Sequence, residues 1–175
     1  MDQIAYFQGI TTAWKKISSK IFSLNKCCYK SRLEIENNNF YKQVLTYGIV
    51  RRGTEVLSFR RGTYNWTEEY LKGSLCIDSG GHVTEEDCDL FNMADLGVRA
   101  NILRELSEEL VLPEADKRRL FNGEAGLDLI GPLNDDSSDV GRRHFAFVFQ
   151  YTVSSDKCGG MPCLRGRVCY PTQVA

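Results

Sequence analysis

The chain has 175 residues and a formal net charge of −1; 42% of its residues are hydrophobic and 26% are charged. This length is typical of one domain, and the composition is that of an ordinary globular protein. A nearly neutral chain lacks the basic field that favours nucleic acid, so we expect no binding to a nucleic-acid duplex. No segment approaches the roughly 20 apolar residues of a membrane span, so we expect no transmembrane segment.

Seven cysteines are present, and the first residues have neither the basic start nor the apolar run of a secretory signal. Disulfides are rare in reducing compartments, so we expect free thiols and a cytoplasmic protein. Cys158, Cys163 and Cys169 form no Cys-x-x-Cys pair, and only two histidines, His82 and His144, are present. These spacings argue against a structural zinc site.

Residues 4–24 carry apolar side chains at spacings of three or four positions, with lysines away from them. This pattern predicts an amphipathic helix. The helix could lie on a membrane surface or mediate a homodimer contact, or it could dock on the domain's own surface; we expect docking. Residues 1–39 are therefore predicted to be an N-terminal amphipathic helix and linker.

A domain is predicted over residues 40–155. Leu45–Phe59 reads as two strands around the turn-forming Arg52-Gly53-Thr54, and residues 73–81 read as a strand ending in Gly80-Gly81. Residues 143–153 are strongly β-prone and predict a later strand. Residues 156–175 show no readable periodicity, which predicts an irregular C-terminal tail.

The hexapeptide Arg104-Glu105-Leu106-Ser107-Glu108-Glu109 lies near the end of a predicted helix. Its three glutamates are spaced i, i+3 and i+4, so they share one helical face. We expect the core-facing stripe on the opposite side, at Leu96, Ala100, Leu103, Leu106 and Leu110. Clustered carboxylates suit a hard divalent cation, although a merely solvated charged face is the alternative.

This region resembles the Nudix box, whose family pattern is Gly-x5-Glu-x7-Arg-Glu-U-x-Glu-Glu-x-Gly-U, with U a bulky aliphatic residue. The match is complete over residues 104–109, and Leu112 occupies the final aliphatic position, but Val111 replaces the usual glycine. Gly80 and Glu86 satisfy Gly-x5-Glu, yet residues 87–103 put 17 positions before Arg104 where the pattern has 7. We interpret this as an insertion around Glu85–Asp95, as in a bacterial-type subgroup with a lengthened box loop.

The resemblance implies an α/β fold, a Nudix-like α/β/α sandwich with a mixed β-sheet. It also implies a metal-dependent hydrolase that cleaves the pyrophosphate linkage of a nucleoside diphosphate derivative by water attack at phosphorus. The substrate would be a small nucleotide-type molecule. Glu105, Glu108 and Glu109 would bind Mg²⁺ or Mn²⁺, Arg104 would orient them, and a backbone carbonyl of Gly80 or Gly81 would complete the metal shell.

Other roles at such a site stay open. Three loop acids are candidates for the general base, although any polar loop has such residues: Asp135, Asp136 and Asp139. Three acids of the insertion could replace the displaced front glutamate: Glu85, Glu86 and Asp89. Four arginines could bind phosphates: Arg60, Arg61, Arg142 and Arg143. Three aromatic residues could stack on a base: Tyr64, Trp66 and Tyr70.

A catalytically silent Nudix-fold module that binds a nucleotide or a protein partner is the alternative to the hydrolase. The stretched loop and Val111 favour the silent module, whereas the intact glutamate hexapeptide favours the enzyme. An unrelated α/β domain with a chance acidic helix is a third interpretation, and it predicts no stabilisation by Mg²⁺.

Overall fold

A computed structural model describes residues 7–22, 26–36, 38, 40–61, 72–88, 93–124, 126–153 and 169–173. The chain divides into two compact units. Unit 1 comprises Met1–Tyr47, Gly80–Ile102 and Leu129–Phe149, and unit 2 comprises Gly48–Ser79, Leu103–Asp128 and Gln150–Ala175. Strands and helices occur in both units, so the expected α/β class is confirmed. The division at residues 39 and 155 stays a prediction.

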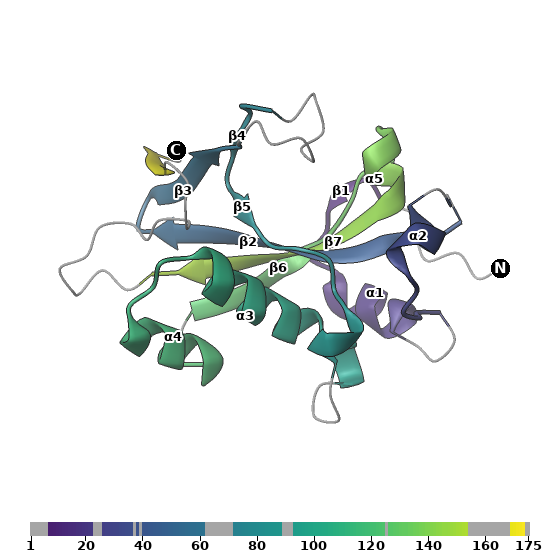
Figure 1. Cartoon of the computed structure of the whole chain (residues 1–175), viewed down its shortest axis with the longest axis horizontal. Coiled ribbons are helices and arrows are strands. Elements are labelled where there is room, and N and C mark those ends of the chain that lie inside the picture. Colours follow the sequence, from purple (N-terminus) through teal and green to yellow (C-terminus); the bar gives the residue numbers. More distant parts are fainter. Residues whose placement is uncertain are drawn as a thin grey trace. The chain divides into compact units, whose positions relative to one another are not determined.

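Figure 1 labels the helices α1 to α5 and the strands β1 to β7 of the described chain. The helices are α1 (Trp14–Ile21), α2 (Arg32–Ile35), α3 (Val98–Glu109), α4 (Glu114–Phe121) and α5 (Asp139–Arg143). The strands are β1 (Gly9–Ile10), β2 (Gln43–Arg52), β3 (Glu55–Arg60), β4 (Leu75–Cys76), β5 (Asp78–Ser79), β6 (Gly126–Asn134), β7 (His144–Thr152) and β8 (Cys169–Gln173). Single 3₁₀ turns cover Glu85–Asp87 and Met93–Asp95. None of these described helices is long and apolar enough to cross a bilayer.

The described strands are hydrogen-bonded in the order β1-β6-β7-β2-β3-β4, with β5 also paired to β2 and β8 to β3. The predicted hairpin around Gly53 is confirmed: β2 and β3 pair antiparallel, and Gly53 takes a φ of +58° that glycine adopts without strain. The predicted late strand is confirmed as β7. The strand predicted before Gly80-Gly81 is present as two short pieces, β4 and β5.

The prediction of one helix over residues 4–24 is wrong at its start. Gly9 and Ile10 form β1, which pairs antiparallel with β6, and the helix begins only at Trp14. A glycine inside a helix costs about 1 kcal/mol, and here Gly9 has a φ of +83° that a helix does not use. Residues 4–6 and 23–24 of the predicted helix lie outside the described residues.

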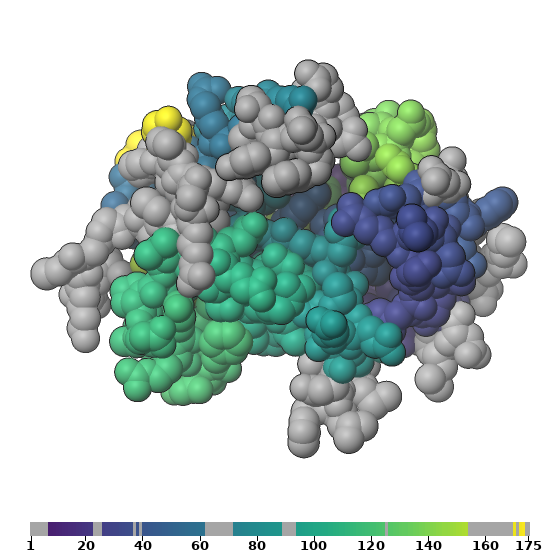
Figure 2. All heavy atoms as spheres, in the orientation of Figure 1, coloured from purple at the N-terminus to yellow at the C-terminus, as the bar shows by residue number. Residues whose placement is uncertain are grey.

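Helix α1 docks on the core of unit 1, as expected. Ile17 and Ile21 are buried, and the ring of Phe22 stacks on Phe147 with 5.5 Å between ring centroids. The following helix α2, drawn in dark blue in Figure 2, lies at the surface of unit 1. Its Leu33 is exposed. The predicted homodimer contact through this arm stays a prediction.

Buried polar contacts in unit 1 anchor the start of the predicted insertion. The fully buried Asn101 of α3 accepts a hydrogen bond from Thr46 Oγ1 at 2.6 Å and donates to His82 O and Asp87 Oδ2. Asp87 also accepts from the backbone and hydroxyl of Thr84. Because these groups are buried and satisfied, they fix the loop before α3 to β2 and to the first turns of the helix.

Unit 2 holds the second half of α3, α4 and the β2–β3 hairpin. Its core includes Leu106, Leu110 and Leu120, each at most 1% exposed. The prediction of a wholly irregular tail is wrong at residues 169–173, because β8 pairs antiparallel with β3. This short strand contains Pro171 and is held by main-chain pairing with β3. Main-chain pairing requires no periodic pattern of side chains, so the sequence did not predict the strand.

Candidate functional site

Helix α3 carries its glutamates beside its buried side, not opposite to it. The predicted stripe is therefore wrong in part: Leu96 precedes the helix with a φ of +49°, and Leu103 is only half-buried. The residues that face the core are Val98, Ile102, Leu106 and Leu110. At about 100° per residue, Glu109 lies about 20° and Glu105 about 60° from Ile102 around the helix. The acidic face thus borders the core.

Arg104 joins two of the three glutamates. Its Nη1 lies 3.0 Å from Glu105 Oε1 and 3.3 Å from Glu108 Oε2. The side chain of Glu105 is 15% exposed, whereas that of Glu108 is 58% exposed. Burial raises the pKa of Glu105, Arg104 opposes this shift, and the charges of Glu109 and Glu108 add to it. Glu105 therefore carries its charge at a cost that a nearby cation would offset.

The third glutamate, Glu109, contacts Ser79. The Ser79 hydroxyl, on the last residue of β5, donates a hydrogen bond to Glu109 Oε2. Ser79 is 3% exposed, so this contact lies at the inner edge of the acidic face. The predicted set Arg104, Glu105, Glu108 and Glu109 is thus gathered on one helix of unit 2, with Ser79 added from a strand.

The donor set of this face fits a divalent cation. Three carboxylates and one guanidinium leave a formal charge of −2 on these four side chains, and carboxylate oxygens are the ligands that Mg²⁺ and Mn²⁺ favour. Within the described residues, no three acidic, histidine or cysteine side chains already stand in metal-binding geometry. Here Glu105 and Glu108 point at Arg104 and Glu109 at Ser79, so binding a cation would require the carboxylates to rotate.

Gly80 and Gly81 form the predicted turn and belong to unit 1. A Cβ at Gly80 would lie 2.0 Å from Thr46 O, so only glycine fits this close backbone approach. Gly81 O accepts a hydrogen bond from Thr46 N at 2.9 Å, which still leaves one carbonyl lone pair. Packing explains Gly80 fully, and its role in a metal shell stays a prediction.

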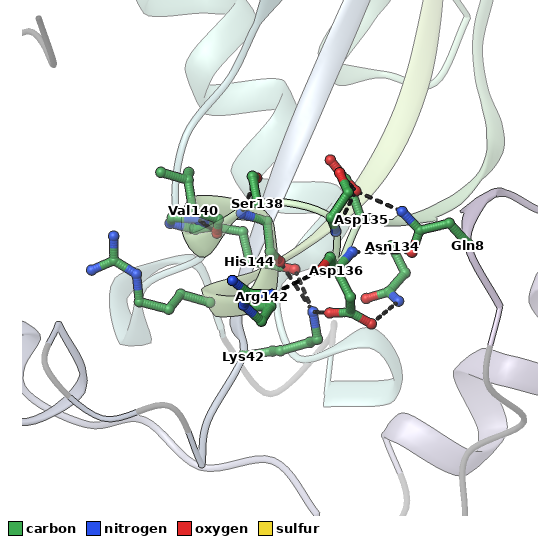
Figure 3. Close-up of polar contacts among 12 residues, drawn as sticks. Gln8, Lys42, Asn134, Asp135, Asp136, Ser138, Val140, Arg142 and His144 are labelled. Atoms are coloured by element: carbon green, nitrogen blue, oxygen red, sulfur yellow. Dashed lines mark hydrogen bonds and ion pairs between the residues drawn. The ribbon is translucent and has the colours of Figure 1, made fainter. Parts of the chain in front are cut away.

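The loop acids proposed as general bases accept hydrogen bonds from donors in unit 1 (Figure 3). Lys42 Nζ lies 2.7 Å from Asp136 Oδ1 and also donates to Gly141 O and His144 O. Asn134 Nδ2 donates to the other oxygen of Asp136. These hydrogen bonds, that of Lys42 first, hold the pKa of Asp136 below its ordinary value.

Asp135 and Asp139 have similar surroundings in the same loop. Asp135 Oδ1 accepts from Gln8 Nε2 at 2.6 Å and from the backbone and hydroxyl of Ser137, and Ser137 chiefly lowers its pKa. Asp139 lies 2.5 Å from Arg142, which lowers the pKa of Asp139. A carboxylate with a lowered pKa is a weak proton acceptor, so this loop is better explained as structure.

The remaining predicted site residues are scattered. In unit 1, Arg142 donates a hydrogen bond to Asp136 O within the loop between β6 and β7. Arg143 donates to Glu36 O and so links this loop to the end of α2. In unit 2, Arg60 donates to Gly73 O and Arg61 to Cys76 Sγ. Glu85 and Glu86 are exposed in a 3₁₀ turn of unit 1. Four predicted residues lie outside the described residues: Tyr64, Trp66, Tyr70 and Asp89.

The two histidines lie together in unit 1. Their ring centroids are 5.4 Å apart, and His144 Nδ1 lies 2.7 Å from Val140 O. Burial first, then the neighbouring His144 and Arg32, lowers the pKa of His82. His82 forms an isolated β-bridge with Leu45, and His144 is the first residue of β7.

Sequence reasoning missed Ser79 and the polar cluster around Asn101. Ser79 directly precedes Gly80-Gly81, so the sequence places it at the predicted turn. Nothing in the sequence identifies Glu109 as its partner. The polar residues Thr46, Asp87 and Asn101 have ordinary sequence surroundings, and only their complete burial distinguishes them.

Comparisons with known proteins bear on the fold. The sequence matches no family model and no curated protein. The structure is similar to that of Tm1382, a candidate Nudix hydrolase, with a TM-score of 0.67 and 19% identity over 96% of this chain and 77% of the other. It is also similar to a bifunctional NMN adenylyltransferase/ADP ribose pyrophosphatase from Francisella tularensis, with a TM-score of 0.50 and 15% identity. That match covers 82% of this chain and 37% of the other. The chain has a Nudix-like fold.

Proposed function

We propose that the protein is a Nudix-type pyrophosphohydrolase that depends on Mg²⁺ or Mn²⁺. Its substrate class would be nucleoside diphosphate derivatives, cleaved at the pyrophosphate linkage by water attack at phosphorus. The observation that carries the proposal is the acidic face of α3, where Arg104 joins Glu105 and Glu108 while Glu109 lies against Ser79. The Nudix-like fold supports it, as does the pyrophosphatase named for the Francisella tularensis protein.

The chain's own residues would perform the binding and orientation. Glu105, Glu108 and Glu109 would hold the cation, which when bound neutralises phosphate charge and lowers the pKa of water. Arg104 would keep two of these carboxylates on the same side of the helix by charge-assisted hydrogen bonds.

A second candidate function is the catalytically silent module that binds a nucleotide. It is favoured by a cavity of about 1040 Å³ formed wholly within unit 1. Its walls include Phe7, Tyr41 and Phe145, with Lys26 and Arg32 among its charged residues. A cavity with aromatic walls and a few charges suits a small organic ligand.

We further propose a cytoplasmic location. Four cysteines of the described residues are free thiols: Cys27, Cys28, Cys76 and Cys88. Free thiols persist in reducing compartments, which supports the proposal.

The test is Mg²⁺-dependent turnover of nucleoside triphosphates, nucleotide sugars, dinucleotides and ADP-ribose, with wild type beside Glu108→Gln. We expect wild type to hydrolyse at least one class and the variant to lose about a hundredfold in kcat or more, because a cation ligand is lost. Asp135→Asn is the matched control, and it should retain activity. Folded wild type that turns over none of these substrates would favour the silent module.

A further inference from the structure

The cavity of unit 1 is formed without the glutamates of α3. Its volume is about 1040 Å³, enough for a small organic molecule, and every described residue that lines it belongs to unit 1. We propose that this cavity is a binding site for a small aromatic anion that carries an N–H donor. The proposal does not rest on hydrolysis, because none of Glu105, Glu108 and Glu109 lines the cavity.

Aromatic side chains form part of the cavity wall. Phe7 and Phe145 pack edge to face, with 6.1 Å between their ring centroids, and Phe145 is buried. Tyr41 adds a ring that is 41% exposed, and Ile21 and Val98 add buried aliphatic side chains. Aromatic rings favour stacked or edge-to-face contacts with one another. The wall therefore favours an aromatic ligand over an inorganic anion.

The charged side chains of the wall favour an anion. Four basic residues stand against three acidic ones, which gives a formal charge of +1: Lys26, Lys30, Arg32 and Lys42 against Glu34, Glu85 and Asp136. Lys30, Arg32 and Lys42 each lie within 4.0 Å of an acidic partner. The side chain of Lys26, like that of Glu85, forms no hydrogen bond or ion pair in the part of the chain that the structure describes. Because the wall is positive overall, the Lys26 ammonium is the group that would meet a phosphate, sulfonate or carboxylate.

Asn134, the last residue of β6, leaves one acceptor in the wall unpaired. Its Nδ2 donates to Phe7 O at 2.9 Å and to Asp136 Oδ2 at 2.8 Å, and it lies beside Asp136 in Figure 3. Both partners are oxygens that only accept, which fixes the orientation of the amide. Oδ1 is buried and has no hydrogen-bond partner among the described residues. A buried unpaired acceptor costs free energy, which an N–H group of a bound ligand would offset.

The test is fluorescence titration of the full chain with 2-anilinonaphthalene-6-sulfonate, an aromatic sulfonate with one N–H group. We expect saturable binding to wild type. The N-methyl analogue of this probe should have a Kd about tenfold higher, because the methyl group removes the donor. In Asn134→Ala the two probes should bind alike, because the acceptor is gone. Equal affinity of the two probes for wild type would overturn the role of Asn134.

Charge and ring variants test the rest of the wall. Lys26→Glu should raise the Kd about fivefold, whereas Lys16→Glu, an equal change of charge at a residue of α1 outside the wall, should not. Tyr41→Ala should raise the Kd by a similar factor, whereas Phe121→Ala, at an exposed ring of unit 2, should not. Melting temperatures measured without probe establish that each variant is folded.

Two thiols report where the probe binds. Cys28 lines the cavity, whereas Cys76 belongs to unit 2, and neither is in a disulfide. A probe at ten times its Kd should slow alkylation of Cys28 by iodoacetamide about tenfold and leave that of Cys76 within about twofold, as measured by peptide mass spectrometry.

Competition identifies the ligand class. Displacement of the probe by adenosine monophosphate would indicate a nucleotide, and displacement by indole-3-acetate an aromatic carboxylate; a probe displaced by neither would overturn the ligand class. No saturable binding to wild type, or binding that leaves Cys28 unprotected and is unchanged in Lys26→Glu, would overturn the proposal. Glu108→Gln should bind the probe as wild type does, so failure of this site and failure of the proposed hydrolase are distinguishable.

Discussion

Acidic side chains occupy two contrasting surroundings in this chain. In the loop between β6 and β7 of unit 1, Asp135, Asp136 and Asp139 accept hydrogen bonds from Gln8, Ser137, Lys42, Asn134 and Arg142, and their pKa values are lowered. On α3 of unit 2, three glutamates share one face, and burial with like charges raises the pKa of Glu105. Acids of the first kind hold the fold together, whereas acids of the second kind are stabilised by adding a cation.

The largest effect is expected from disrupting the unit 1 loop. A Cβ at Gly141 would lie 2.0 Å from Asp135 O, so Gly141→Ala should lower the free energy of unfolding by about 2 kcal/mol. Urea unfolding measures it. Gly123→Ala is the control, because apart from its chain neighbours no atom of the described residues lies within 4 Å of its Cβ position and only its φ of +73° is strained, costing about 1 kcal/mol. Wild-type stability in Gly141→Ala would show that the loop is not closely packed.

Opposite pH dependence should separate the two kinds of acid. Asp136→Asn removes the partner of Lys42 and should cost at most about 1 kcal/mol at neutral pH, since the pair is partly exposed. Because the folded pKa of Asp136 lies below its ordinary value of 3.8, its contribution is present above that pH and is lost as the pH falls through the folded value. The difference from wild type should therefore vanish in strong acid.

Glu105→Gln should act in the opposite direction in the same unfolding series. The folded pKa of Glu105 is raised above its ordinary value of 4.5, so its contribution is full below that pH and is lost as the pH rises through the folded value. Without metal, the variant should match wild type in acid and exceed it by roughly 0.5 kcal/mol at neutral pH. A variant that is less stable at neutral pH would contradict the cost that burial and the neighbouring like charges impose on charged Glu105.

Much of the fold follows from local sequence. The Gly53 hairpin, the helix that ends in Glu109 and the strand β7 depend on turn chemistry and periodicity, which a sequence displays. The start of the N-terminal helix and the strand β8 could not be predicted from the sequence. Gly9–Ile10 and residues 169–173 are held by main-chain pairing with distant strands, for which their side chains give no pattern.

The candidate site could be predicted only in part from the sequence, for a related reason. The spacing of Glu105, Glu108 and Glu109 shows that they share a face, but which side of α3 is buried depends on Ile102 and its neighbours in space. Partners far along the chain, such as Ser79 for Glu109 and Lys42 for Asp136, arise from tertiary structure alone.

The most direct test of whether a cation binds only to the acids of α3 is thermal unfolding with and without millimolar Mg²⁺. It compares wild type with Glu108→Gln and Asp136→Asn. Binding to the folded state raises the melting temperature by mass action. We expect Mg²⁺ to stabilise wild type and Asp136→Asn by similar amounts, and Glu108→Gln far less. A melting temperature that does not respond to Mg²⁺ in wild type, or a response that survives in Glu108→Gln and disappears in Asp136→Asn, would contradict the assignment of the metal site to α3.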